Sequence, residues 1–496
     1  MRAPLAQYPG MNRFVLDWLN GDERFLPRRT PPRRARKIAQ ELVAALDASN
    51  RHWGIFVKEQ LQRWGAGETY TIVAGQQVGF AGGPLYTLAK LASLVKIKRE
   101  LEAEGTPVTA FFWLATEDHD FDEIATLNVP AKPADPSSQL DLLCIRAVRA
   151  TESRVAVGSL PVPESLITQL LAVYHMPRPA WLREGITFRD SFAELIAATF
   201  GSEIILVDAL LPELRRAGAP LFEQIHAKHD DIQRTLRERG AAIDAAGYNE
   251  QVVANEDNEY TLRFAIDEEG RRQPITDNRQ HPPERTSTSA LTRPLLQDFV
   301  LQPDVFLGGP AEVAYYAQIA PLHELLNITM PRIALRGHAL VAPKRVTKAM
   351  ERYAIEPHEV FAPADAILAE REPEGVARIR QLAEEGKREL MKRIEQIGEL
   401  ALPADHSLAG SINKSIGHLE FHFNKLSERA IKGMVRKEKE RYAATREVVA
   451  TLYPDRHVQD RVVSWFAYWC TYGQHLADRL VDEVEPDSAF FRVVSL

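Results

Sequence analysis

Residues 69–124, TYTIVAGQQVGFAGGPLYTLAKLASLVKIKRELEAEGTPVTAFFWLATEDHDFDEI, decide the fold of this chain. Two short apolar runs, residues 70–74 and 108–115, each end abruptly in polar residues. Between them, leucines recur from residue 85 onward at the spacing of one helix face. The pattern predicts a strand, a glycine-rich loop, a helix and a second strand. Open parallel sheets bind ligands at the carboxyl ends of their strands, so we expect the functional site here.

Further apolar runs alternate with helical patterns over the first 370 residues, and this region is expected to form the core of the protein together with N-terminal helices. Alternating strands and helices on this scale predict an α/β fold with a doubly wound parallel sheet. Two small β insertions are expected, near residues 129–163 and 245–290, the second around a hairpin signal at residues 268–270. The further predicted strands lie at residues 204–208 and within residues 299–309, and two short apolar pieces lie at residues 333–335 and 340–342.

The last third of the chain has a different pattern. Apolar residues approximate a heptad seam over residues 376–394, Pro403 interrupts it, and alternating spacings of four and three follow over residues 412–430. This predicts a helical coiled-coil arm over residues 371–455, with a helix over residues 456–496 that returns to the core. Such an arm either mediates dimerisation or docking, or pairs only within one chain. The sequence leaves both alternatives open.

Composition narrows the class of protein. The net charge of −7 and the pI near 6.1 argue against a dedicated nucleic-acid binder. Cys144 and Cys470 are the only cysteines, which excludes a disulfide scaffold and a thiolate zinc site and favours a cytoplasmic protein. Neither a signal sequence nor a membrane span is expected, because the start of the chain carries acidic residues and no apolar run is long enough.

An acidic cluster with one imidazole follows the second apolar run, in Glu117, Asp118, His119 and Asp120. A histidine flanked by carboxylates is expected to have a raised basicity and a fixed orientation, which suits a general base. The carboxylates could also recognise an amine. They could also hold Mg²⁺, but a metal site is the less favoured interpretation, because ligand spacing alone does not specify one. The alternative interpretation is a helix N-terminus capped by acids.

Paired amides follow the first apolar run. Gln76 and Gln77 stand at a predicted strand tip, where they are better explained as ligand hydrogen-bonders than as core. The glycine-rich connection after them could admit an anion close to its backbone amides, or could simply be a tight turn. Lys90, on the predicted helix, is either solvated or an anion partner.

A second polar constellation lies farther along the chain. Arg293 could clamp a carboxylate or a phosphate bidentately. A glycine-rich turn at residues 308–310 precedes a predicted helix on which Glu312 and Tyr315 share a face. A packed helix start explains this pattern equally well. The candidate residues of this constellation are Arg293, Gln297, Gly308, Gly309, Glu312, Tyr315 and Arg336.

Four motifs together, AGQQVGFAGGPLYTLAK, FFWLATEDHDFDEI, TRPLLQDF and LGGPAEVAYYAQ, resemble the cysteine ligase family of bacillithiol biosynthesis. The resemblance implies a Rossmann-like core with two insertions of the connecting-peptide type, as in class I aminoacyl-tRNA synthetases and nucleotidylyltransferases. It also implies a coiled-coil domain that forms a homodimer. The implied reaction is the last step of the pathway, which joins the carboxyl group of L-cysteine to the glucosamine amine of glucosaminyl-malate.

The resulting hypothesis is an amide-forming ligase. His119 would act as general base, and Asp118 and Asp120 would bind the amine groups. ATP is the expected partner, because a free carboxylate must be activated before it forms an amide; no metal or prosthetic group is implied. The alternatives are a nucleotidylyltransferase and a non-catalytic coiled-coil scaffold. The substrate-binding candidates are Gln76, Gln77, Tyr86, Lys90, Glu117, Arg293, Gln297, Gly308, Gly309, Glu312, Tyr315 and Arg336.

Overall fold

The computed structural model divides into two compact units. The core unit comprises Met1–Ala131, Leu142–Val341 and His457–Leu496, and the arm unit comprises Ala342–Arg456. The arm unit therefore begins at Ala342, well before residue 371, where the sequence predicts the start of the coiled-coil arm. The structure describes residues 1–29, 38–130, 142–147, 154–254, 259–268, 270–275, 281–370, 375–437 and 439–496. Parts of both expected insertions, residues 131–141, 148–153, 255–258, 269 and 276–280, lie outside this description.

The centre of the core unit is a parallel sheet. In the described part of the chain it has five strands in the order β11-β10-β2-β3-β6, and all its pairings are parallel. Its strands are buried on both faces, which is why they read in the sequence as continuous apolar runs. The bounds are Tyr70–Gln76 for β2, Val108–Leu114 for β3, Ile205–Asp208 for β6, Val305–Gly308 for β10 and Arg332–Leu335 for β11.

Helices cover both faces of this sheet. Phe111 of β3 packs on Trp64 of α3, whereas the next residue, Phe112, faces Phe192 of α7. Successive strand residues point to opposite faces, so α3 and α7 lie on opposite sides. The core helices are α1 Arg13–Leu19, α2 Gln40–His52, α3 Lys58–Gly65, α4 Leu85–Ala103, α5 Phe121–Ile124, α6 Glu164–Tyr174, α7 Phe188–Phe200, α8 Pro212–Ala217, α9 Ala219–Ala227, α10 His229–Ala245, α11 Arg293–Leu301, α12 Pro310–Leu325, α18 Gln459–Val462, α19 Phe466–Tyr472 and α20 Gln474–Glu483.

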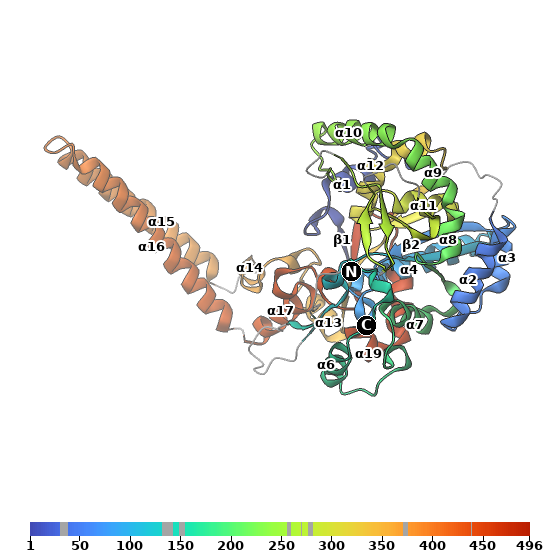
Figure 1. The fold of residues 1–496 in the computed structure, drawn as a ribbon. Helices are drawn as coiled ribbons and strands as arrows, with labels where there is room; N and C mark the ends of the chain where they lie inside the picture. The colour runs from blue at the N-terminus through green and yellow to red at the C-terminus, as the bar shows by residue number, and fades with distance from the viewer. Residues whose placement is uncertain are drawn as a thin grey trace. The chain divides into compact units, whose positions relative to one another are not determined.

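The chain leaves the two adjacent strands β2 and β10 in opposite directions along the sheet. β2 leads through α4 to β3, and β10 leads through α12 to β11 (Figure 1). Such a reversal opens a crevice outside the carboxyl ends of the two strands. The predicted doubly wound, Rossmann-like α/β core is therefore confirmed, and its switch point lies between β2 and β10.

Three small β elements decorate the core unit in the part of the chain that the structure describes. β4 and β5 form one hairpin after α5, and β7, β8 and β9 form a sheet in the order β8-β7-β9. The third sheet, in the order β1-β13-β12, brings the two termini side by side (Figure 1). The bounds are β1 Arg2–Pro4, β4 Thr126–Pro130, β5 Leu142–Arg146, β7 Arg263–Ile266, β8 Arg272–Pro274, β9 Thr286–Thr288, β12 His338–Ala342 and β13 Phe490–Ser495.

The C-terminal segment differs from the single helix expected over residues 456–496. It folds as α18, α19, α20 and strand β13. Val463 is extended and forms a parallel bridge with Asn128, which ends α18, and Gly473 at φ +52° separates α19 from α20. Backbone pairing replaces helix continuation at Val463, whereas the positive φ of Gly473 ends α19.

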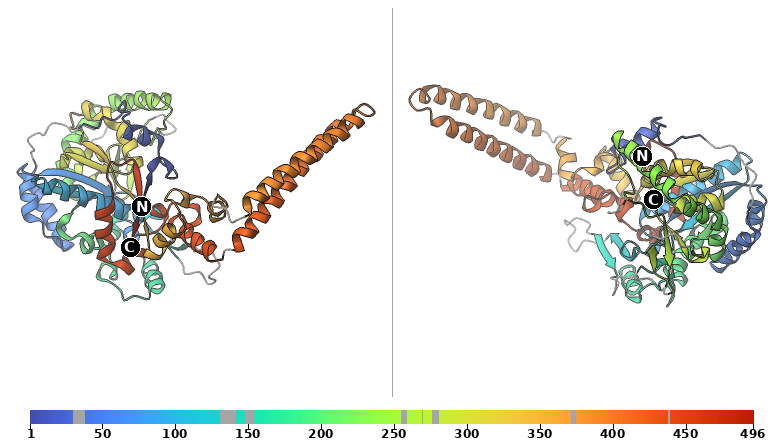
Figure 2. Two further views of the ribbon diagram at one scale, coloured as in Figure 1. Left: turned by 180° about the vertical axis from the view of Figure 1, so that it is seen from behind. Right: turned by 45° about the horizontal axis from the view of Figure 1, so that its top comes forward.

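The arm unit is helical. α15 and α16 lie side by side in both views of Figure 2 and pack along their length, with Phe423 against Gly386 and Ile412 against Gly398. Leu368, Val376 and Ile431 form a small buried cluster at one end. The predicted coiled coil is confirmed. The arm helices are α13 Lys344–Arg352, α14 Ala364–Glu370, α15 Val376–Ala401, α16 Leu408–Lys437 and α17 Lys439–Leu452. No helix in the described residues is long and apolar enough to cross a membrane.

His338 should make the stability of the core unit depend on pH. It is 2% exposed beside the Tyr8 ring, and burial, followed by the charge of Arg336, holds its pKa well below the usual range. Below about pH 6.5 the unfolded chain binds a proton that the folded histidine does not. We therefore expect the unfolding free energy to fall on acidification, by up to about 1.4 kcal/mol per pH unit.

Urea unfolding followed by tryptophan fluorescence measures how the unfolding free energy changes with pH. The measurements should run from about pH 7.5 to about pH 5.5, because this range spans the ordinary histidine pKa. His338→Phe should flatten this pH dependence relative to the parent, whereas the same change at the exposed His418 should not. Equal slopes in the parent and in His338→Phe would show that His338 is not the group responsible.

Candidate functional site

A cavity of about 980 Å³ opens at the carboxyl ends of β2, β3 and β10. It lies at the switch point of the sheet, where the topology provides a crevice. Most of the residues singled out from the sequence line it, although they come from segments more than two hundred residues apart. These are Gln76, Gln77, Tyr86, Lys90, Glu117, Asp118, His119, Arg293, Gly309, Glu312, Tyr315 and Arg336.

Lys90 and Glu312 join the two halves of the cavity wall. Lys90 is 1% exposed, and its ammonium group donates to the carbonyl of Gly75 (2.7 Å), to Oε1 of Gln76 (3.0 Å) and to the Glu312 carboxylate. Glu312 also accepts a bond from the backbone amide of Gly309 (2.7 Å). Burial lowers the pKa of Lys90 and the Glu312 charge opposes that shift. The pair ties the tip of β2 to the start of α12.

Glu117 lines the cavity but is engaged by three neighbours. It is 5% exposed and accepts hydrogen bonds from the hydroxyls of Ser287 and Thr288, both at 2.6 Å. The buried guanidinium of Arg215 lies 3.7 Å from the same carboxylate. Because its oxygens are already occupied, Glu117 fastens the β9 strand to the tip of β3.

Asp118 and His119 face the cavity as a pair. Oδ2 of Asp118 accepts a bond from Gln77 (2.6 Å), and Oδ1 lies 3.5 Å from Nδ1 of His119. The expectation that flanking carboxylates raise the basicity of His119 is wrong. Burial, followed by the positive charge of Arg272, lowers its pKa, and these effects outweigh Asp118 and Asp120. The imidazole is therefore neutral at neutral pH.

Three candidates do not line the cavity. The Asp120 side chain caps α5 by accepting a bond from the amide of Glu123 (3.1 Å), which is the alternative interpretation of the acidic cluster. Gln297 is fully buried and contacts Arg293 and Asp298 from below. Gly308 is the last residue of β10, where a side chain would collide with Glu312 and Phe306.

Two further arginines of the cavity wall, Arg293 and Arg336, differ in the groups that they contact. Arg293 donates to the Tyr315 hydroxyl and to Gln297 (3.4 Å), so no carboxylate contacts it among the described ion pairs. Arg336, 5% exposed, is paired with Asp460 (3.2 Å) and lies over the Tyr86 ring. Burial raises the pKa of Tyr86 to about 12. Of the two, Arg293 is the more available to an anion.

Sequence reasoning missed two arginines of the cavity wall. Arg272, on the β8 strand of the second insertion, is 6% exposed and lies 4.0 Å from Asp118. Arg461, in α18, lines the cavity from the C-terminal segment and donates to the carbonyl of Gly10 (3.2 Å). Glu123 also lines it. A hairpin signal marks the neighbourhood of Arg272, but only tertiary folding brings either arginine to the sheet.

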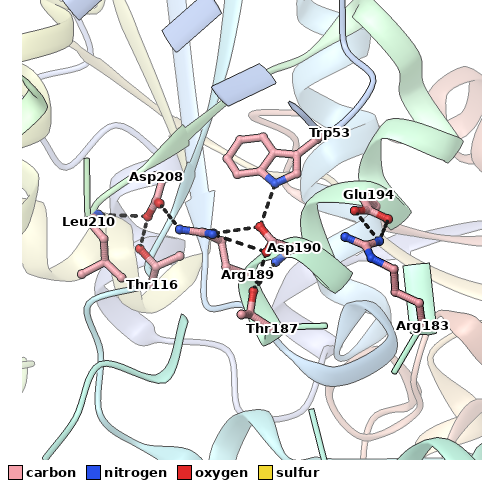
Figure 3. Close-up of polar contacts among 9 residues, drawn as sticks. All are labelled: Trp53, Thr116, Arg183, Thr187, Arg189, Asp190, Glu194, Asp208 and Leu210. Carbon is pink, nitrogen blue, oxygen red and sulfur yellow. Dashed lines mark hydrogen bonds and ion pairs between the residues drawn. The ribbon is translucent and has the colours of Figure 1, made fainter. Parts of the chain in front are cut away.

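A second polar network lies behind the tips of β3 and β6 (Figure 3). Asp208, at the end of β6, accepts bonds from Thr116 and from Arg189 (3.2 Å). Arg189 also pairs with Asp190 (2.9 Å), which accepts a bond from the Trp53 indole (3.0 Å). The network anchors Thr116, the residue before Glu117, and so fixes the turn that carries the acidic cluster. Among the described residues, no group of three or more His, Cys, Asp or Glu side chains is arranged to hold a metal ion.

Comparison with known proteins extends over both units. A family model described as the N-terminal Rossmann-like domain of bacillithiol biosynthesis BshC matches residues 22–337, and one described as its C-terminal coiled-coil domain matches residues 339–496. Three similar proteins, from Koribacter versatilis, Solibacter usitatus and Bacillus thuringiensis, each carry the name "Putative cysteine ligase BshC".

The similarity covers most of each protein. The Koribacter protein is 29% identical over 455 residues, 83% of this chain and 81% of its own length. The Solibacter protein is 28% identical over 493 residues, with 94% and 90% covered, and the Bacillus protein is 27% identical over 521 residues, with 94% and 92% covered. Since the first family model alone matches more than half of the chain, this protein belongs to the BshC family of bacillithiol biosynthesis.

Proposed function

We propose that this protein is an amide-forming ligase that joins the carboxyl group of L-cysteine to the glucosamine amine of glucosaminyl-malate, the last step of bacillithiol biosynthesis. The observation that carries the proposal is the composition of one cavity wall. The wall presents a carboxylate–imidazole pair, Asp118 and His119, together with the arginines Arg272 and Arg293. A substrate that has an amine and carboxylates requires both kinds of group.

His119 is the proposed general base. The attacking amine must lose a proton as its nitrogen bonds to the cysteine carbonyl carbon, and a neutral imidazole can accept that proton. The lowered pKa of His119 supports this role, because it keeps the ring neutral at neutral pH. Asp118, fixed by Gln77, orients the ring and offers its charge to the substrate ammonium group.

Arg272 and Arg293 are the proposed ligands of the malate carboxylates. A guanidinium binds a carboxylate through two parallel hydrogen bonds, and both side chains lie at the cavity with few anionic partners. Lys90, which the sequence offered for the same task, is engaged by Glu312 and has a positioning role in this proposal. ATP is proposed as the co-substrate: its phosphoryl or adenylyl group is transferred to an oxygen of the cysteine carboxylate, and that oxygen leaves as part of phosphate or AMP when the amine nitrogen bonds to the carbonyl carbon.

The purified protein incubated with L-cysteine, glucosaminyl-malate and ATP should yield the cysteine amide, detected by mass spectrometry. Reactions that lack one component, or that contain L-alanine in place of cysteine, are the controls. Pyrophosphate release without an amide would favour a nucleotidylyltransferase instead. In the native host, deletion of the gene should abolish bacillithiol and accumulate glucosaminyl-malate; unchanged thiols would contradict the assignment.

We also propose that the protein works in the cytoplasm as a homodimer through the arm unit. Phe421 and Leu426 on α16 are 59% and 66% exposed in the single chain, which leaves apolar surface for a partner helix. Sedimentation analysis should give a dimer for the parent and a monomer for Phe421→Glu/Leu426→Glu. His418→Glu, at an exposed polar position of the same helix, should remain dimeric. A monomeric parent protein would exclude the proposal.

A further inference from the structure

A second, smaller cavity of about 230 Å³ adjoins the first and is not used by the proposed reaction. Its floor is the glycine-rich turn and the first turn of α4, with Gly83, Pro84 and Thr87 among its lining residues. The wall that it shares with the larger cavity consists of Gln76, Gln77, Tyr86, Glu123 and Arg461. A group bound there would therefore lie next to whatever occupies the larger cavity.

Thr87 is the unusual residue of this cavity. Its side chain is fully buried, and its hydroxyl has no hydrogen-bond partner among the described residues. Leaving a buried donor unpaired costs free energy, whereas valine would fill the same space without that cost. Because Thr87 lines this cavity, its hydroxyl is a candidate hydrogen-bond donor to a group bound there.

The surroundings of Thr87 favour an anion. α4 is a 19-residue helix whose N-cap, Pro84, has no side-chain cap. The amide of Leu85 donates to the carbonyl of Val463 (2.9 Å), and the positive end of the helix dipole lies at the cavity. The preceding Gly83 has φ +72° and no side chain to cover this end. Arg461 adds a cation whose described hydrogen bond goes to a neutral carbonyl. Glu123 is the opposing charge on the wall, and burial raises its pKa, which weakens the opposition.

We propose that the second cavity binds a phosphate-class oxyanion through the Thr87 hydroxyl, the N-terminus of α4 and Arg461. This inference rests on the proposed function for its purpose, because activation of a carboxylate by ATP brings phosphate groups to the reaction. Its geometry stands independently of that function. The oxyanion is either a phosphate group of the nucleotide or free inorganic phosphate.

Titration calorimetry with inorganic phosphate, using the full chain in phosphate-free buffer, tests the proposal without requiring turnover. We expect the parent to bind phosphate and Thr87→Val to bind it about tenfold or more weakly, since it lacks one hydrogen bond to a charged group. Thr87→Ser, which keeps the hydroxyl, should restore binding. Thr71→Val is the matched control, because Thr71 is equally buried, has an equally unpartnered hydroxyl and lines neither cavity.

The folded state provides a second readout. Thr87→Val should be at least as stable as the parent without phosphate and should gain less stability when phosphate is added. Competition by ATP for the same Thr87-dependent binding would identify the oxyanion as a nucleotide phosphate, and additive binding would identify free phosphate. Absence of phosphate binding in the parent, or equal binding by Thr87→Val, overturns the proposal. Neither result depends on whether the ligase assay succeeds.

Discussion

Replacement of His119 by alanine should lower kcat by about 10²–10⁴-fold, the contribution of a positioned general base. Without the imidazole, the carboxylates of the acidic cluster are weaker bases than histidine, and Glu117 is occupied by Ser287 and Thr288. Steady-state amide formation, followed over a range of pH, measures the effect. The acid limb of the parent profile should lie below the ordinary histidine value, since burial and Arg272 lower the pKa of His119.

The controls separate chemistry from folding. His475→Ala, at an exposed position of α20, should keep the parent rate, and His119→Ala should keep the parent unfolding midpoint because its side chain is 43% exposed. Asp118→Asn should reduce kcat, whereas Asp120→Ala should act mainly through the stability of α5, by about 1 kcal/mol, as the loss of an N-cap. Full activity in His119→Ala would remove this residue from the mechanism.

Glu312→Gln should lower the unfolding free energy of the core unit by about 3–5 kcal/mol. The change leaves the ammonium group of Lys90, which is 1% exposed, without its countercharge. Lys90→Met should cost less, because the Glu312 side chain is 20% exposed at the cavity and can be solvated there. Urea unfolding followed by tryptophan fluorescence gives both values.

The double variant Lys90→Met/Glu312→Gln isolates the pair. Its loss of unfolding free energy should be smaller than the sum of the losses in the two single variants, since the double variant leaves no buried charge without a partner. Lys96→Met, on the same helix but at a solvent-exposed hydrogen bond to a backbone carbonyl, should change stability by no more than about 0.5 kcal/mol. Additive losses in the double variant would mean that Lys90 and Glu312 contribute separately.

The layered core follows directly from the amino-acid sequence. Strands buried on both faces have to be continuous apolar runs, and their helices have to show the helical period, so β2, α4 and β3 can be read directly from residues 69–124. The location of the site near the strand tips can be predicted from the same sequence pattern, because the carboxyl ends of parallel strands lie at one edge of the sheet. The coiled coil of α15 and α16 is likewise a local, periodic property.

Tertiary structure alone decided which charges meet. Lys90 and Glu312 are separated by 222 positions in the sequence, and Arg461 and Arg272 reach the cavity from the C-terminal segment and from a hairpin insertion. The pKa of His119 shows the same division: its sequence neighbours are acids that would raise it, but burial and a distant arginine lower it. Periodicity reports how a segment folds, whereas electrostatics depends on distances through space, and packing sets those distances.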